Sequence, residues 1–100
     1  MTLSEVIINC ESYNEFSFVY SKKLNDRFYT NSEAVILELD ESEMETNTSE
    51  IARQKCPGFD YFLEIFIIQD MYKDLKKMDD YKLDEKLIFE RIIYYAENDA

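Results

Sequence analysis

The sequence lacks histidine and tryptophan and contains only one glycine and one proline among its 100 residues. Without histidine, the commonest general base is missing, and neither a Ser–His nor a Cys–His nucleophile can be built. Because Gly58 is the only glycine, no glycine-rich loop can hold a phosphate. The scarcity of turn residues also argues against a β-sandwich or barrel, which needs them about every 8–12 positions. We therefore expect a fold without many turns and a protein that is not an enzyme.

Cysteine is also sparse, and Cys10 and Cys56 match no metal-binding or redox spacing. We expect each to be a buried free thiol. A calcium loop starting at Asp40 would need glycine at its sixth position and glutamate at its twelfth. Glu45 and Ile51 stand there instead. The sequence therefore predicts no metal site and no cofactor.

Long hydrophobic runs are absent, and a run such as Ile65–Ile68 is far too short to span a bilayer. No basic segment precedes an apolar stretch near the N-terminus, as it would in a signal peptide. These features predict a cytoplasmic protein without a membrane partner.

Basic residues are few, with 11 against 22 acidic residues and a net charge of −11. No base lies between Arg27 and Arg53, but seven acids do: Glu33, Glu38, Asp40, Glu41, Glu43, Glu45 and Glu50. Such a surface repels nucleic-acid phosphates and attracts basic proteins at long range. The alternative is that these acids only keep the protein soluble.

What the chain does contain is apolar material, 46% of its residues including seven Phe and eight Tyr, enough for a folded core. Helical spacing of these residues predicts an all-α fold, a compact bundle of four to five helices in one domain over residues 1–100. Capping-box patterns that begin at Thr2, Thr30 and Asn47 support three of the helix starts. The expected helices lie near 3–22, 31–44, 48–55, 59–78 and 83–97.

The expected bundle has one uncertain segment and a defined set of core residues. The segment from Glu15 to Tyr20 also suits a strand, so a short strand near 15–20 stays open. The core is expected to depend on four large apolar residues, Phe62, Phe66, Leu87 and Ile92.

The candidate binding surface is the acidic segment of the second expected helix. Glu38, Glu41 and Glu45 fall at i, i+3 and i+7, which would place them on one helical face. We predict that a basic partner protein contacts Glu38, Asp40, Glu41, Glu43 and Glu45. The aromatic residues Tyr13, Phe16, Phe18 and Tyr20 could form a base-stacking platform, but such platforms need a cationic groove. We therefore expect them in the core and expect no nucleic-acid partner.

Three segments together suggest a family: Arg27–Asn31, the acidic stretch from Glu38 to Glu50, and Cys56–Glu64. In size, charge and order they resemble the small immunity proteins of bacterial contact-dependent growth inhibition systems. The resemblance implies a cytosolic protein that binds and neutralises a cognate toxin domain. The sequence does not determine the oligomeric state, and we favour a monomer. Many such toxins are nucleases, which are basic because they hold phosphates.

Two alternative functions stay open, and the first shares the charge-based recognition of an immunity protein. One is a phage-encoded acidic mimic of nucleic acid that inhibits a host nuclease, of the anti-CRISPR type. The other is the antitoxin subunit of a different toxin–antitoxin pair, although no basic DNA-binding arm is visible.

Overall fold

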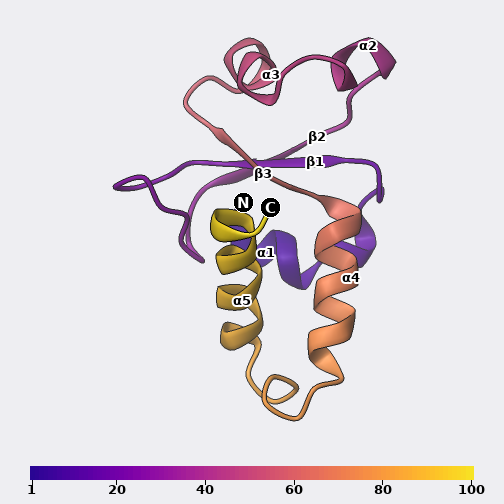
Figure 1. Ribbon diagram of the computed structural model, residues 1–100, viewed down its shortest axis with the longest axis vertical. Coiled ribbons are helices and arrows are strands. Elements are labelled where there is room, and N and C mark those ends of the chain that lie inside the picture. The colour runs from indigo at the N-terminus through magenta and orange to yellow at the C-terminus, as the bar shows by residue number, and fades with distance from the viewer.

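The computed structural model describes residues 1–100 and contains a three-stranded antiparallel sheet between two groups of helices (Figure 1). The sheet has the strand order β2-β1-β3. Helices α1, α4 and α5 lie on one side of the sheet, and α2 and α3 lie on the other (Figure 1). The elements in chain order are α1 (Leu3–Ile8), the 3-10 turn η1 (Cys10–Ser12), β1 (Phe18–Ser21), β2 (Ala34–Leu37), α2 (Glu41–Met44), α3 (Thr48–Lys55), β3 (Asp60–Glu64), α4 (Ile65–Lys76) and α5 (Glu85–Asn98).

The expected all-α bundle is wrong, because the fold is a mixed α/β one. Each strand lies inside a segment expected to be helical: β1 within 3–22, β2 within 31–44 and β3 within 59–78. The strand considered near 15–20 corresponds to β1. Helices α3 and α5 lie where helices were expected.

The strands have helix-like apolar runs because the sheet is covered on both faces. In β1, Val19 packs into a larger core beneath the sheet, while Phe18 and Tyr20 pack into a smaller core under α3. In β2, Ala34 and Ile36 likewise enter the larger core, and Val35 and Leu37 pack against the smaller one. A strand with two buried faces shows a continuous apolar run and no polar–apolar alternation.

A β-bulge in β3 adds to the larger core. Val19 pairs with Leu63 and Tyr20 with Tyr61, so Phe62 is the extra residue between them. As a result, Phe62 and Leu63, neighbours in sequence, both enter the larger core. The Phe62 ring meets that of Phe28 edge-on, with centroids 5.0 Å apart. The bulge thus brings one more large side chain to the core face of a short strand.

The connection from β1 to β2 makes a tight turn without glycine. Asn25 and Asp26 both adopt the left-handed conformation, with φ of 54° and 62°. Leu24 and Arg27 flank them and exchange backbone hydrogen bonds of 2.9 and 3.2 Å. Asn and Asp tolerate positive φ better than other non-glycine residues. This pair therefore makes a tight turn that usually contains glycine.

The three capping patterns have three outcomes. Thr2 and Glu5 form the expected capping box at the start of α1. Asn47 caps α3 through Ser49, without the reciprocal bond from Glu50. Thr30 starts no helix, because the segment after it leads into β2.

The core assignments are partly confirmed. Phe62 and Ile92 are buried as expected, but Phe66 and Leu87 are each 42% exposed, so their assignment to the core is wrong. Cys10 lies in the larger core and Cys56 in the smaller, and both are buried free thiols, as expected. Burial raises the pKa of Cys10 to about 11. None of the helices has the length and apolar character needed to cross a membrane.

The difference between Phe62 and Phe66 gives a test of the fold. Phe62→Ala removes a fully buried ring and should lower the free energy of unfolding by about 3–5 kcal/mol. Phe66→Ala should lower it by less than about 1.5 kcal/mol, since much of that ring already contacts water. Urea denaturation of both variants measures the two values. Equal losses would contradict the placement of β3 and the start of α4.

Candidate partner-binding face

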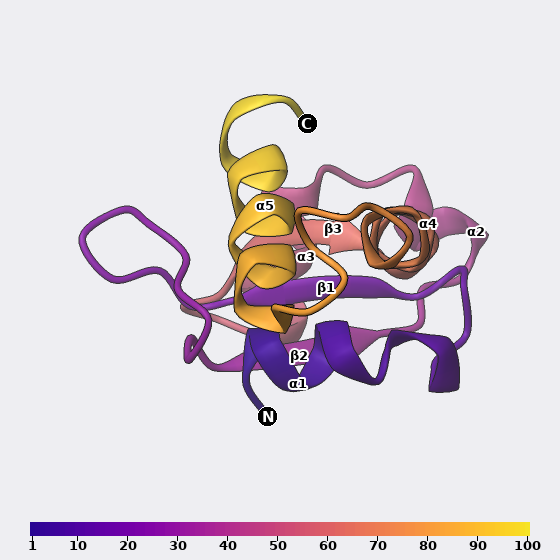
Figure 2. The ribbon, with the colours of Figure 1, turned by 90° about the horizontal axis from the view of Figure 1, so that it is seen from below.

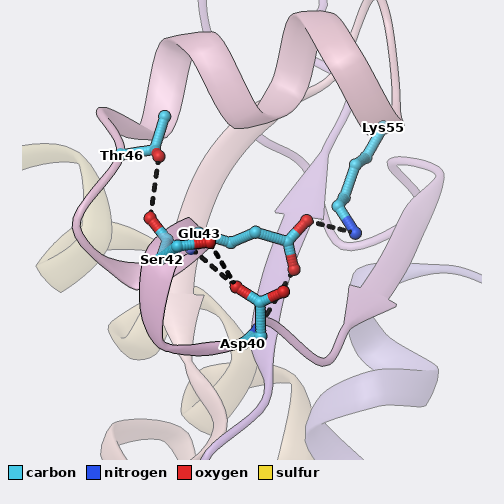
Figure 3. Close-up of polar contacts among 5 residues, drawn as sticks. All are labelled: Asp40, Ser42, Glu43, Thr46 and Lys55. Atoms are coloured by element: carbon cyan, nitrogen blue, oxygen red, sulfur yellow. Dashed lines mark hydrogen bonds and ion pairs between the residues drawn. The ribbon is translucent and has the colours of Figure 1, made fainter.

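Helix α2 is a single turn that is stabilised by its own polar groups. Asp40 is the N-cap: its carboxylate accepts the Glu43 backbone N–H at 2.9 Å, and Glu43 Oε1 accepts the Asp40 N–H at 3.0 Å. The Ser42 hydroxyl also donates to Asp40, and the Thr46 hydroxyl donates to the Ser42 carbonyl (Figure 3). Because α2 buries none of its residues, these bonds replace the packing that holds most helices.

One ion pair joins α2 to α3. The Glu43 carboxylate points toward the last residue of α3, with Lys55 Nζ 2.6 Å from Glu43 Oε2 (Figure 3). Hydrogen bonding to Lys55, followed by that from the Asp40 backbone, lowers the pKa of Glu43. The backbone bond from Glu43, then that from the Ser42 hydroxyl, lowers the pKa of Asp40. Both groups are therefore ionised at neutral pH and are unsuited to act as general acids.

The predicted binding residues lie close together in sequence but do not share a helix face. Glu38 lies after the end of β2, Asp40 caps α2, and Glu45 ends it, so the expected i, i+3, i+7 alignment on a helix 31–44 is wrong. Glu43 is half-buried and bonded within the protein. The other four are exposed, and we call them the acidic face: Glu38, Asp40, Glu41 and Glu45.

Ion pairs neutralise some of the seven acids between Arg27 and Arg53 but none of the acidic face. Three of the seven acids form ion pairs: Glu33 with Lys22, Glu43 with Lys55 and Glu50 with Arg53. No residue of the acidic face forms an ion pair. Of the seven acids between Arg27 and Arg53, the four without an ion pair thus all lie in residues 38–45.

An apolar hollow of about 130 Å³ lies beside the acidic face. We call it the α2 hollow, and its lining residues are Phe16, Phe18, Met44, Glu64 and Phe66. Phe16 is 67% exposed and Met44 49%, so large apolar groups contact solvent here. The expectation that Phe16 belongs to the core is wrong, whereas Tyr20 is fully buried as expected.

The turn that presents Phe16 is fixed by hydrogen bonds. The Phe16 N–H donates to the Asn14 side chain at 2.9 Å, and the amide of Asn14 donates to Glu38 at 3.3 Å. On the other side, the N–H of Phe66 donates to the Glu15 carbonyl at 3.0 Å. Asn14 thus connects the hollow directly to the acidic face.

A second, larger hollow of about 430 Å³ lies between α5 and the 22–33 loop, which projects from the sheet in Figure 2. Its charged residues are two bases and two acids, Arg27, Lys86, Glu90 and Glu97. They pair with one another, Arg27 with Glu97 at 3.9 Å and Lys86 with Glu90 at 4.0 Å. This hollow therefore favours no ligand of either sign.

The sequence pointed to the acids but missed the residues around them. Asp40 and Glu43 have the capping-box spacing, a local signal that could have placed the start of α2. No local signal connects Glu43 to Lys55 or brings Phe16 and Met44 to one hollow, since these contacts join distant segments. No three carboxylate or thiol groups converge in a way that could hold a metal ion.

The ion pair between α2 and α3 has a measurable titration signature. Lys55→Met should raise the pKa of Glu43 toward its ordinary value of 4.5, because the stabilising ammonium is lost. A lowered carboxyl pKa contributes stability above about pH 4.5 that is lost as pH falls through the folded-state value. The α2–α3 ion pair of the wild type should therefore be lost as the pH falls through this value, and the variant should lack this pH-dependent contribution to stability.

Carbon-13 NMR titration of the side-chain carboxyls measures this shift. Lys22→Met is the matched control, because Lys22 pairs with Glu33 and should leave Glu43 unchanged. An unaltered Glu43 curve in Lys55→Met would show that the pair does not form in solution.

The comparisons with known proteins identify a family. The model of the DUF7716 family, described as a domain of unknown function, matches residues 1–100. Neither the curated proteins nor the solved structures provide a match. With a match over its whole length, the chain belongs to the DUF7716 family.

Proposed function

We propose that this protein is an immunity protein that binds a cognate basic toxin domain, in the simplest case a nuclease, and covers its substrate cleft with the acidic face. The observation that carries the proposal is the segregation of charge. Of the seven acids between Arg27 and Arg53, three are neutralised by bases, and the acids at 38, 40, 41 and 45 remain exposed without one. A surface that served only solubility would usually mix both signs.

The physics of recognition follows from this arrangement. A nuclease cleft is basic because it must hold phosphates. Exposed carboxylates are negatively charged at neutral pH, as phosphates are, and can therefore bind in the same cleft. Long-range attraction raises the association rate and depends on ionic strength, because the Debye length is only about 8 Å at 0.15 M salt. The fixed geometry of α2 helps, since a preordered interface loses less conformational entropy on binding.

A charge-reversal experiment tests the proposal. In Glu41→Lys/Glu45→Lys, two exposed side chains of the acidic face change sign, and the fold should be retained. The partner to test is the product of the gene immediately upstream of this one, whatever its sequence. Wild-type protein should protect cells that express it, and the double variant should lose protection and bind more weakly by several kcal/mol through like-charge repulsion.

Asp74→Lys/Asp80→Lys is the matched control. Both side chains are exposed, neither forms an ion pair, and they lie at the far end of α4 and in the loop that follows, the end of the molecule opposite α2 (Figure 1). This control has the same net charge as Glu41→Lys/Glu45→Lys and should still protect the cells. If Glu41→Lys/Glu45→Lys binds within a factor of about three of wild type, roughly 0.7 kcal/mol, the acidic face only solvates the protein.

A further inference from the structure

The α2 hollow combines exposed apolar side chains with neighbouring acidic residues. It contains exposed aromatic and thioether groups, Phe16, Met44 and Phe66, at 67, 49 and 42% exposure. Its only charged lining residue is an acid, Glu64. Met44 lines it from α2, the turn that carries Glu41 and is capped by Asp40 and Glu45 of the acidic face. The apolar α2 hollow thus lies next to the acidic face.

The dimensions of the hollow limit what it can hold. Its volume of about 130 Å³ is close to that of an engineered cavity of about 150 Å³ that binds benzene. One aromatic or branched aliphatic side chain fits this space, and a drug-sized molecule, which needs about 300 Å³ or more, does not. Side chains of this class, seated in a central pocket, supply much of the energy at protein interfaces.

The walls of the hollow are fixed before any ligand arrives. Backbone bonds from Ile65 to Ser17 at 2.9 Å and from Phe66 to Glu15 at 3.0 Å join the Phe16 turn to the start of α4. A third, from Ser17 to the Asn14 carbonyl at 3.0 Å, closes the turn itself. Phe16 is therefore exposed on a fixed turn, which lowers the entropy lost when a partner packs against it.

We infer that the α2 hollow is the anchor subsite of the partner-binding face: it receives one large apolar side chain from a basic polypeptide segment, whose flanking Lys or Arg residues contact the acidic face. Charge complementarity selects this occupant. A second copy of the chain, with a net charge of −11, would be repelled by the acidic face. The inference rests on the proposed function, to which it adds the chemistry of the contacted segment.

Synthetic peptides test this inference without the toxin. The probe is a peptide with one tryptophan flanked by lysines on both sides, compared with the same peptide carrying alanine and with a version whose lysines are glutamates. Because the protein has no tryptophan, the fluorescence of the peptide reports its own environment. We expect a blue shift on binding, and an affinity for the lysine–tryptophan peptide at least about tenfold above that of either comparison peptide.

Variants of the protein locate the binding. Phe16→Ala and Met44→Ala should each remove the blue shift and weaken binding of the tryptophan peptide about tenfold, without altering that of the alanine peptide. Leu83→Ala, at a 91% exposed site in the loop between α4 and α5, is the control and should bind like wild type. Thermal melts verify that all three variants are folded.

Three outcomes would overturn the inference. Equal binding of the tryptophan and alanine lysine peptides would show that charge alone acts. Equal binding of the lysine and glutamate tryptophan peptides would show that the hollow takes apolar groups whatever their charge. Wild-type dimers in analytical ultracentrifugation that Phe16→Ala dissociates would make a second copy the occupant.

The two proposals can fail separately. If the toxin is neutralised through Glu41 and Glu45 but Phe16→Ala and Met44→Ala bind it as wild type does, the proposed function stands and the anchor subsite does not. If the peptides bind as expected but the upstream gene product neither binds nor harms cells, the subsite stands and the immunity function fails.

Discussion

The structure depends on the burial of β1 between two hydrogen-bonded neighbours and two layers of helices. Both edges of β1 pair, with β2 and with β3. Its side chains enter two cores in alternation, Val19 on one side and Tyr20 on the other. A slip of one residue would exchange these sides and place the wrong groups in each core. The register of this one strand therefore fixes where β2 ends and α2 begins, and where β3 passes into α4.

The candidate site is a consequence of that register. The segment after β2 leaves the sheet at Glu38, and α2 begins immediately beyond it, held by the Asp40–Glu43 capping box and by Lys55 of α3. Phe18, at the start of β1, and Glu64, at the end of β3, lie opposite each other in the sheet and line the hollow together with Met44. The acidic face and the hollow thus belong to one corner of the molecule. Its polar half is stabilised locally and its apolar half by the sheet.

The sequence predicted more of the helices than of the sheet. The positions of α3 and α5, the Thr2 cap and the buried thiols depend on local patterns or on general properties of a residue type, and these expectations were correct. The strands could not be separated from helices by periodicity, because a two-sided strand such as Ala34–Leu37 and a buried helix both present an unbroken apolar run. The shortage of glycine pointed further from a sheet, yet Asn25 and Asp26 supply the positive φ that one of its turns requires.

By itself the sequence determined the quantities that do not depend on which residues meet: the net charge of −11, the absence of histidine and the stretch of acids without a base. Only the tertiary structure decided which of those charges stay unneutralised, because Lys22 and Lys55 reach Glu33 and Glu43 from other segments. It also decided that Phe16 is exposed and Tyr20 buried, although both are large aromatic residues four positions apart. The physical reason is that burial follows from the layers on either side of a strand, and those layers come from distant parts of the chain.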